Sequence, residues 1–87
     1  MSNVAEPDRE KIAILVTETI TAILPLVTPD QIREDIHLMD LGADSVDRVE
    51  IIMLLIERCG LNEPMSSFSA IPDIGALIDF VRERKRR

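Results

Sequence analysis

The 87-residue sequence has room for one small domain and little space for a catalytic pocket beneath a core. It is 46% hydrophobic but only 2% aromatic, so its core must be built from aliphatic side chains, a composition that favours packed helices. The net charge of -6 makes the chain repel nucleic-acid phosphates and attract basic protein partners at fast, salt-sensitive rates.

The first predicted element is a helix over residues 8–24, which Pro25 ends. Residues 1–6 before it form a short polar start without the charged-then-apolar plan of a signal peptide, so we expect a cytoplasmic protein. The positions expected to face the core recur at helical spacing: Ile12, Val16, Thr19, Ile20 and Ile23.

A long connection over residues 25–43 follows. Its Thr28-Pro29-Asp30 segment predicts a helical turn, and Gly42 breaks the chain near its end. Because four aliphatic residues can anchor it over the helix ends, we expect the connection to be ordered: Ile32, Ile36, Leu38 and Leu41.

The second helix is predicted from Asp44, as N-cap with Asp47 three positions on, to Cys59, with Gly60 as the C-terminal stop. A helical wheel places Leu54 within the polar arc, so we expect it to be exposed. Cys59 is the only cysteine, which excludes an internal disulfide, and is predicted to pack in the core. The expected core face comprises Val49, Ile52, Leu55, Ile56 and Cys59.

A short third helix is predicted over residues 66–70, and Pro72-Asp73 starts the last helix. Residues 82–87 hold five of the ten basic residues, which leaves residues 1–81 with 15 acidic and 5 basic ones. This basic tail could contact RNA or a membrane, but a frayed, solvated terminus is the simpler interpretation. The expected core residues of the last helix are Ile74, Leu77, Ile78 and Val81.

These elements predict an all-α four-helix bundle with three longer helices, one short helix and a long first loop. It would be a single domain over residues 1–87, with its core over about 8–81, and a monomer. The longest apolar run, residues 51–56, is too short to cross a bilayer, so no membrane partner is expected.

Catalytic and metal-binding patterns are missing. The one histidine, His37, lies in the long loop without a motif, so we expect it to pack there rather than act as a general base. Asp40, Asp44 and Asp47 cluster, but their spacing does not match a calcium-binding loop. We therefore expect no catalytic residue, no metal site and no enzyme activity.

The most informative segment is residues 40–50, DLGADSVDRVE. It resembles the signature of acyl carrier proteins, whose modified serine lies in an Asp-Ser-Leu triplet after a Leu-Gly pair at the start of the second helix. Ser45 matches that serine, and the resemblance in helix lengths and loops extends over about residues 8–81. The alternative is that Ser45 is simply a helix-start serine beside a capping aspartate.

The resemblance implies that Ser45 accepts a 4′-phosphopantetheine arm from coenzyme A, through a phosphopantetheinyl transferase, and that the arm's thiol carries acyl groups as thioesters. The first turn of a helix suits a phosphate, because free backbone N–H groups and the helix dipole favour negative charge there. No neighbouring residue could activate the Ser45 hydroxyl, so partner enzymes, such as acyltransferases or ketosynthases, would perform the chemistry.

In the family, acidic residues of the second helix meet basic partner surfaces. The acids of this helix could alternatively be only a solvated face, and Val49 and Met53 could pack in the core rather than beside a partner or an acyl chain. We predict a recognition face made of Asp44, Val46, Asp47, Arg48, Val49, Glu50, Met53, Leu54 and Glu57.

Three residues depart from the family pattern: Val46 replaces the usual leucine, Arg48 adds a positive charge among the acids, and Glu63 stands where an aliphatic residue is common. The Asp-Arg pair after the serine triplet resembles free-standing carriers of bacterial polyketide clusters, which deliver acetyl groups to a hydroxymethylglutaryl-synthase-like enzyme in β-branching. A fatty-acid or aminoacyl carrier is the alternative within the family. An unmodified helical protein-interaction module is the alternative outside it.

Overall fold

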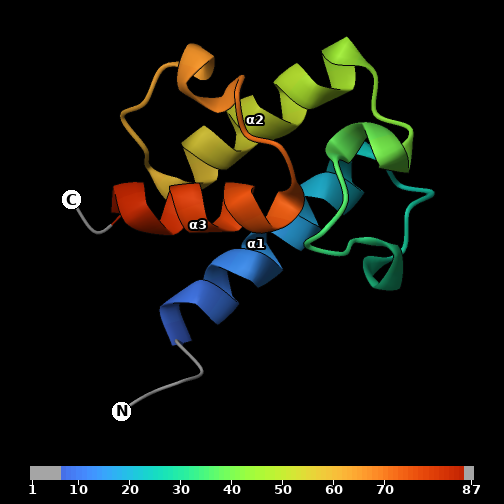
Figure 1. The fold of residues 1–87 in the computed structure, drawn as a ribbon, viewed down its shortest axis with the longest axis horizontal. Coiled ribbons are helices and arrows are strands. Elements are labelled where there is room, and N and C mark those ends of the chain that lie inside the picture. Colours follow the sequence, from blue (N-terminus) through green and yellow to red (C-terminus); the bar gives the residue numbers. More distant parts are fainter. Residues whose placement is uncertain (1–6, 86–87) are drawn as a thin grey trace.

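A computed structural model describes residues 7–85, which contain helices and no strand (Figure 1). The predicted all-α bundle of three longer helices and one short one is therefore confirmed, with two further single turns in the long loop. In chain order the elements are α1 (Pro7–Ile23), η1 (Pro29–Gln31), η2 (Leu38–Leu41), α2 (Ser45–Cys59), η3 (Met65–Phe68) and α3 (Ile74–Lys85), where η marks a 3-10 helix.

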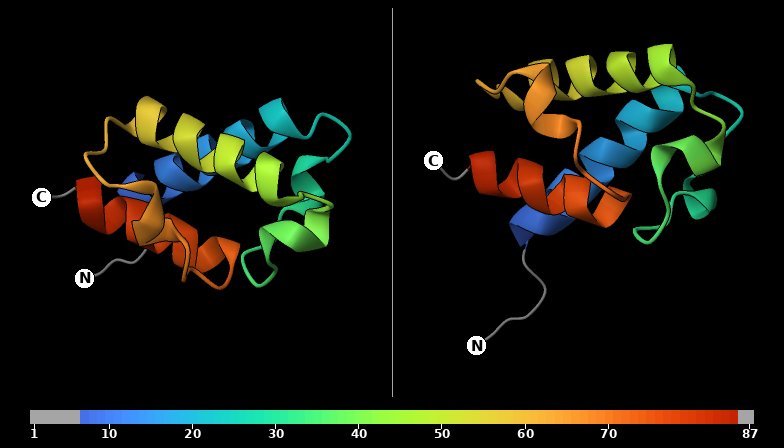
Figure 2. Two further views of the ribbon diagram at one scale, coloured as in Figure 1. Left: turned by 90° about the horizontal axis from the view of Figure 1, so that it is seen from above. Right: turned by 45° about the horizontal axis from the view of Figure 1, so that its top comes forward.

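The helix α1 packs against both other long helices, and the views in Figure 2 show it crossing beneath α2 and α3. Its residues Ile12, Val16, Thr19 and Ile20 are buried as predicted, whereas Ile23 at its end is only partly buried. The Thr19 hydroxyl donates to the carbonyl of Leu15 at 2.7 Å, which satisfies a polar group inside the core. None of the helices within residues 7–85 is long and apolar enough to span a membrane.

The core face of α2 differs from the predicted one. Ile52, Leu55 and Cys59 are buried as predicted, and Ile51 joins them with no exposed surface. Val49 is instead 44% exposed and Ile56 is partly exposed. The helix is rotated so that the Ile51, Leu55 and Cys59 row meets the core, which leaves Val49 and Ile56 at the edges of the interface.

The long loop is anchored as predicted. Leu38 is buried, and the partly buried Ile32, Ile36 and Leu41 pack on the core. The predicted turn after Thr28 is η1, whereas the second turn, η2, was not predicted.

The long loop is joined to α3 through backbone hydrogen bonds. The N–H of Ile74 donates to the carbonyl of Ile36 at 2.9 Å, and that of Gly75 donates to Glu34 at 2.8 Å. A Cβ at Gly75 would lie 3.2 Å from the Glu34 carbonyl oxygen, so only glycine permits this close approach without a shift. The loop thus satisfies donors at the start of α3 that would otherwise lack partners.

The C-terminal elements also differ from the sequence prediction. The short third helix is a 3-10 turn over Met65–Phe68 rather than residues 66–70. Its last residue, Phe68, is buried and packs against Phe80 with ring centroids 4.9 Å apart. The last helix extends to Lys85, beyond the expected end of the core at residue 81.

Residues 82–85 are therefore not a frayed tail. The Arg84 guanidinium lies 4.6 Å from the centre of the Phe80 ring, and its Nε lies 3.1 Å from a carboxylate oxygen of Glu63. The Lys85 ammonium donates to the carbonyl of Cys59 at 3.4 Å. The remaining tail residues, 86–87, and the N-terminal residues 1–6 lie outside the described residues.

Candidate functional site

Ser45 is the first residue of α2, and its side chain is exposed. The chain reaches it through Gly42, whose φ of 89° places it in the left-handed region that glycine adopts without strain, and through the buried Ala43. The turn at Gly42 ends η2 and redirects the chain into α2. The sequence thus holds Ser45 at the protein surface, at the start of a helix.

The start of α2 is fixed by a reciprocal capping box. The Asp44 carboxylate accepts a hydrogen bond from the Asp47 N–H at 2.8 Å, and the Asp47 carboxylate accepts from the Asp44 N–H at 3.4 Å. Both acids are thus used in capping, and Asp47 is half-buried. The N-cap at Asp44 and the stop at Gly60 are confirmed.

Within residues 7–85 the Ser45 hydroxyl forms no hydrogen bond, and so no side chain there is placed to take its proton. The positive end of the α2 dipole favours negative charge at this point. This chemistry suits a hydroxyl that accepts a phosphate-linked group from another enzyme. It does not suit a nucleophile that attacks substrates by itself.

A groove of about 300 Å³ begins at Ser45. One wall is the face of α2 that bears Arg48, Val49 and Ile52, and the other is the η3 region. The groove combines apolar side chains with the polar Ser66 and Ser69. It therefore fits an amphipathic group attached to Ser45, such as a pantetheine chain with its amides and methyl groups.

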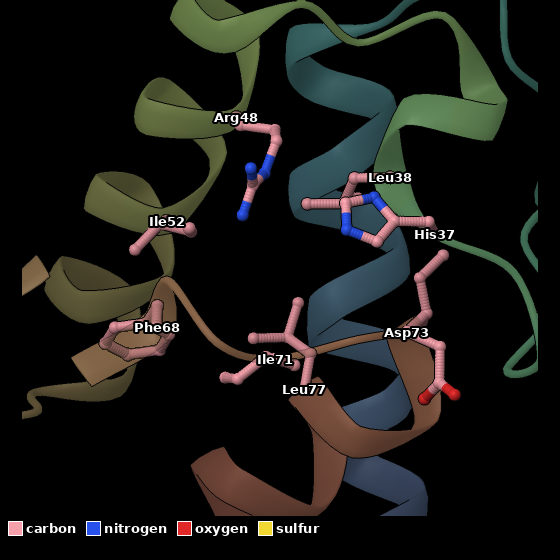
Figure 3. A pocket seen from close by; sticks show the side chains of 9 residues that line it. His37, Leu38, Arg48, Ile52, Phe68, Ile71, Asp73 and Leu77 are labelled. Carbon is pink, nitrogen blue, oxygen red and sulfur yellow. The ribbon is translucent and has the colours of Figure 1, made fainter. Parts of the chain in front are cut away.

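A small cavity of about 20 Å³ lies beside the groove, and Arg48 and Ile52 line both. Figure 3 shows the Arg48 guanidinium directed into this cavity, with Phe68 below it and Asp73 on the far side. The sequence placed Arg48 on the outer acidic face, and this expectation is wrong. The side chain is half-buried and turned inward, so the outer face of α2 near Ser45 remains acidic.

The other predicted recognition residues fall into two groups. Leu54 is half-buried rather than exposed, and it lines the same hollow as Ile23 at the end of α1. Those that are exposed are Asp44, Val46, Val49, Glu50, Met53 and Glu57. The exposure of Val49 and Met53 rules out core packing for these two side chains.

An open apolar hollow lies on the outer side of α2, between the C-terminal end of α1 and η3, with Glu50 and Glu57 at its rim. The sequence prediction included Met53 and Leu54 but missed Ile23, Ile56 and Met65, which also line it. Ile56 was missed because the wheel placed it in the core. Ile23 and Met65 come from other elements, which no helical wheel of α2 can include.

His37 packs within the loop as predicted. Its Nδ1 accepts a hydrogen bond from the Met39 backbone N–H at 3.1 Å, and the His37 backbone N–H donates to the Asp40 carboxylate at 2.9 Å. Cys59 is buried as predicted, and this burial raises the pKa of its thiol. No group of three or more His, Cys, Asp or Glu side chains among residues 7–85 could hold a metal ion.

Comparison with known proteins identifies the family. The family model described as "Phosphopantetheine attachment site" matches residues 15–81. These residues include Ser45 and all those that line the groove and the apolar hollow. The chain is 31% identical over 77 residues to the "Polyketide biosynthesis acyl-carrier-protein AcpK" of Bacillus subtilis, covering 88% of this chain and 94% of that protein.

Two other relatives are named "Acyl carrier protein". That of a Sulfurovum species is 41% identical over 56 residues, covering 63% of this chain and 75% of the relative. That of Helicobacter pylori is 33% identical over 76 residues, covering 87% and 92%. No solved structure matches the chain.

Proposed function

Because the chain belongs to the acyl carrier protein family, whose members are phosphopantetheine-bearing carriers rather than enzymes, we propose that Ser45 is the residue that bears the arm. The exposed position of Ser45 at the first residue of a capped helix carries this proposal. The groove that begins at Ser45 supports it, because a group attached there can lie along the protein.

The arm supplies a thiol on which acyl groups are held as thioesters. The chain's own residues orient that arm. The capping box fixes the backbone on either side of Ser45, and the dipole of α2 favours the negative phosphate. The transferase and the acyl-processing partners carry out the bond-making and bond-breaking steps.

The recognition surface that we propose for these partners is the outer side of α2. Exposed Asp44, Glu50 and Glu57 would attract basic side chains, and the apolar hollow between Glu50 and Glu57 would receive an apolar one. Charge complementarity of this kind accelerates encounter and selects among partners. Exposed Val46 and Val49 extend the apolar contact towards Ser45.

We place the carrier in polyketide biosynthesis, since a relative named for that pathway matches along almost its whole length. The Asp47-Arg48 pair after Ser45-Val46 supports a finer proposal, delivery of an acetyl group to a hydroxymethylglutaryl-synthase-like partner. A fatty-acid carrier is the second candidate, favoured by the relatives named simply as acyl carrier proteins.

Attachment is tested by intact mass after incubation with coenzyme A and a broad-specificity phosphopantetheinyl transferase. Wild type and Ser66→Ala, a change in the same groove, should gain one phosphopantetheine, and Ser45→Ala should gain none. If wild type gains no mass, the interaction-module alternative replaces the carrier. If Ser45→Ala still gains the arm, the site is elsewhere.

The pathway is tested by acyl transfer. The acetyl-loaded carrier should pass its acetyl group to a hydroxymethylglutaryl-synthase-like enzyme from a polyketide cluster faster than a malonyl-loaded form supports elongation by a fatty-acid ketosynthase. The reverse order of rates would favour the fatty-acid carrier.

A further inference from the structure

The chain has two lysines, Lys11 and Lys85, and although they lie near opposite ends of the sequence they line one pocket. This basic pocket has a volume of about 190 Å³ and lies between the start of α1 and the end of α3. Residues three or four positions apart share one side of a helix, so each helix presents its lining residues together. The basic pocket is lined by Asp8, Lys11, Ile12, Arg82 and Lys85.

Both lysine charges lack a carboxylate partner among residues 7–85. Lys11 is exposed and forms no ion pair there, with Asp8 or with any other acid. The Lys85 ammonium donates only to the backbone carbonyl of Cys59, at 3.4 Å, within the same residues. A single solvated lysine is ordinary, but two lysines at one concave site make that site attractive to an anion.

The basic pocket lies at the opposite end of the molecule from Ser45. Figures 1 and 2 show the start of α1 beside the end of α3, whereas α2 begins at the other end. The outer side of α2 is acidic, with exposed Glu50 and Glu57. An acidic partner is therefore repelled by α2 and attracted by the basic pocket, so charge alone orients its approach.

The lining favours a carboxylate side chain over a phosphate-covered surface. The buried Ile12 gives the pocket an apolar wall, on which the methylene groups of a glutamate can pack while its carboxylate meets the lysines. A membrane or a nucleic acid would also approach the exposed acids of the same two helix ends, Asp8, Glu10 and Glu83. Together with the net charge of -6, these acids oppose a broad anionic surface more than a single narrow segment.

We propose that the basic pocket binds a glutamate-rich segment of a partner protein. Such a segment would hold the carrier at this end and leave Ser45 accessible to the enzymes that use the arm. This proposal concerns a second surface and does not depend on which residue bears the arm.

The test uses the intact carrier and two peptides of equal length, one alternating glutamate with serine and the other alternating glutamine with serine. In ¹H–¹⁵N spectra, the glutamate peptide should shift the backbone amide signals of residues 8–12 and 82–85 and leave those of residues 45–57 unchanged. The glutamine peptide should shift none of them. Binding of the glutamate peptide should weaken as salt rises, because salt screens exposed charges.

Three variants separate the pocket from the net charge of the carrier. Lys11→Gln should weaken binding of the glutamate peptide several-fold, because it removes an ammonium from the pocket. Lys85→Gln should do the same. Arg33→Gln removes one positive charge outside the pocket and should bind the peptide as wild type does. Titration of the amide shifts measures each dissociation constant.

Four outcomes would overturn the proposal. The first is that the glutamate peptide shifts no signals, or shifts signals scattered over the surface. The second is equal affinity of Lys11→Gln and Arg33→Gln. The third is that an RNA oligonucleotide or phosphatidylglycerol vesicles bind the pocket more tightly than the peptide at the same salt concentration.

The fourth is that raising the carrier concentration, without peptide, shifts the same signals, which would make a second copy of the chain the occupant. None of these outcomes affects the attachment of the arm, which is tested separately by mass.

Discussion

At the scale of single residues, the direction in which each charged side chain of α2 points decides whether a partner can reach it. Asp44, Asp47 and Arg48 are close neighbours along α2, but the first two cap the helix and the third turns into the bundle. Glu50 and Glu57 are exposed beside the apolar hollow and form no hydrogen bond or ion pair with residues 7–85. These two acids are therefore free to meet a basic partner.

Glu50→Lys should slow acyl transfer to a partner enzyme several-fold, because it places a positive charge at the rim of the proposed docking surface. The slowing should diminish as salt rises. The measurement is the transfer rate at low and high ionic strength. Glu18→Lys, the same charge change at an exposed position of α1, is the control and should transfer at the wild-type rate. Equal rates for both variants would remove Glu50 from the recognition surface.

The acid Asp47 is a poorer choice for this test, although the sequence alone suggested it equally. Its carboxylate caps the Asp44 N–H, so Asp47→Lys would alter the start of α2 together with the surface charge.

At the scale of elements, α1, the long loop and α3 are joined by one arginine. Arg9 donates from its two Nη atoms to the Glu34 carboxylate at 2.9 and 2.8 Å, and from Nε to Asp79 at 2.8 Å. These hydrogen bonds to Glu34 and Asp79 raise the pKa of the Arg9 guanidinium, and the bond from Arg9 lowers the pKa of the Glu34 carboxyl.

Arg9→Gln should lower stability by on the order of 1 kcal/mol near neutral pH, a modest effect because both carboxylates are about half exposed. Because the folded-state pKa of Glu34 is below its usual value of 4.5, this contribution is fully present above that pH. It is lost as the pH falls through the lower folded-state value.

Urea unfolding of wild type and Arg9→Gln at pH 7 and at decreasing acidic pH measures this difference. Arg33→Gln is the control, because among residues 7–85 Arg33 pairs only with Asp35, two residues away, and so joins no elements there. A stability difference between wild type and Arg9→Gln that did not change with pH would contradict the role given to Glu34.

At the scale of the whole molecule, the three long helices meet in an aliphatic core that the sequence pattern largely identified. Helix bounds followed from local signals such as Pro25, Asp44 and Gly60, because caps and breakers act on their immediate neighbours. The rotation of α2 did not follow, since both Ile51 and Ile56 are apolar and only the packing of α1 and η3 against the helix selects between them.

The site likewise has features that follow from local sequence and features that depend on tertiary packing. The identity of Ser45 as a candidate came from its sequence context, whereas the inward turn of Arg48 and the contributions of Ile23 and Met65 depend on tertiary packing. The packing of Arg84 on Phe80 likewise needs the helix α3 to continue past the point where the apolar pattern ends. A charged segment was therefore misjudged as a frayed tail.

The corrected rotation of α2 predicts unequal effects of two similar substitutions. Ile51→Ala should cost about 2–5 kcal/mol, because Ile51 is fully buried and its removal leaves a cavity. Ile56→Ala should cost clearly less, since Ile56 is partly exposed. Urea unfolding of both variants makes the comparison, and an equal or reversed order would support the rotation that the helical wheel predicted.

The central claim, that this carrier bears its arm on Ser45, is tested most directly by locating the arm after loading. Trypsin cleaves after Arg33 and Arg48, and the peptide of residues 34–48 contains Ser45 as its only hydroxyl-bearing residue. Fragmentation of the loaded wild-type digest should release pantetheine from this peptide and leave the other serine-containing peptides unmodified. An unmodified 34–48 peptide in a chain that has gained the mass of the arm would contradict the account.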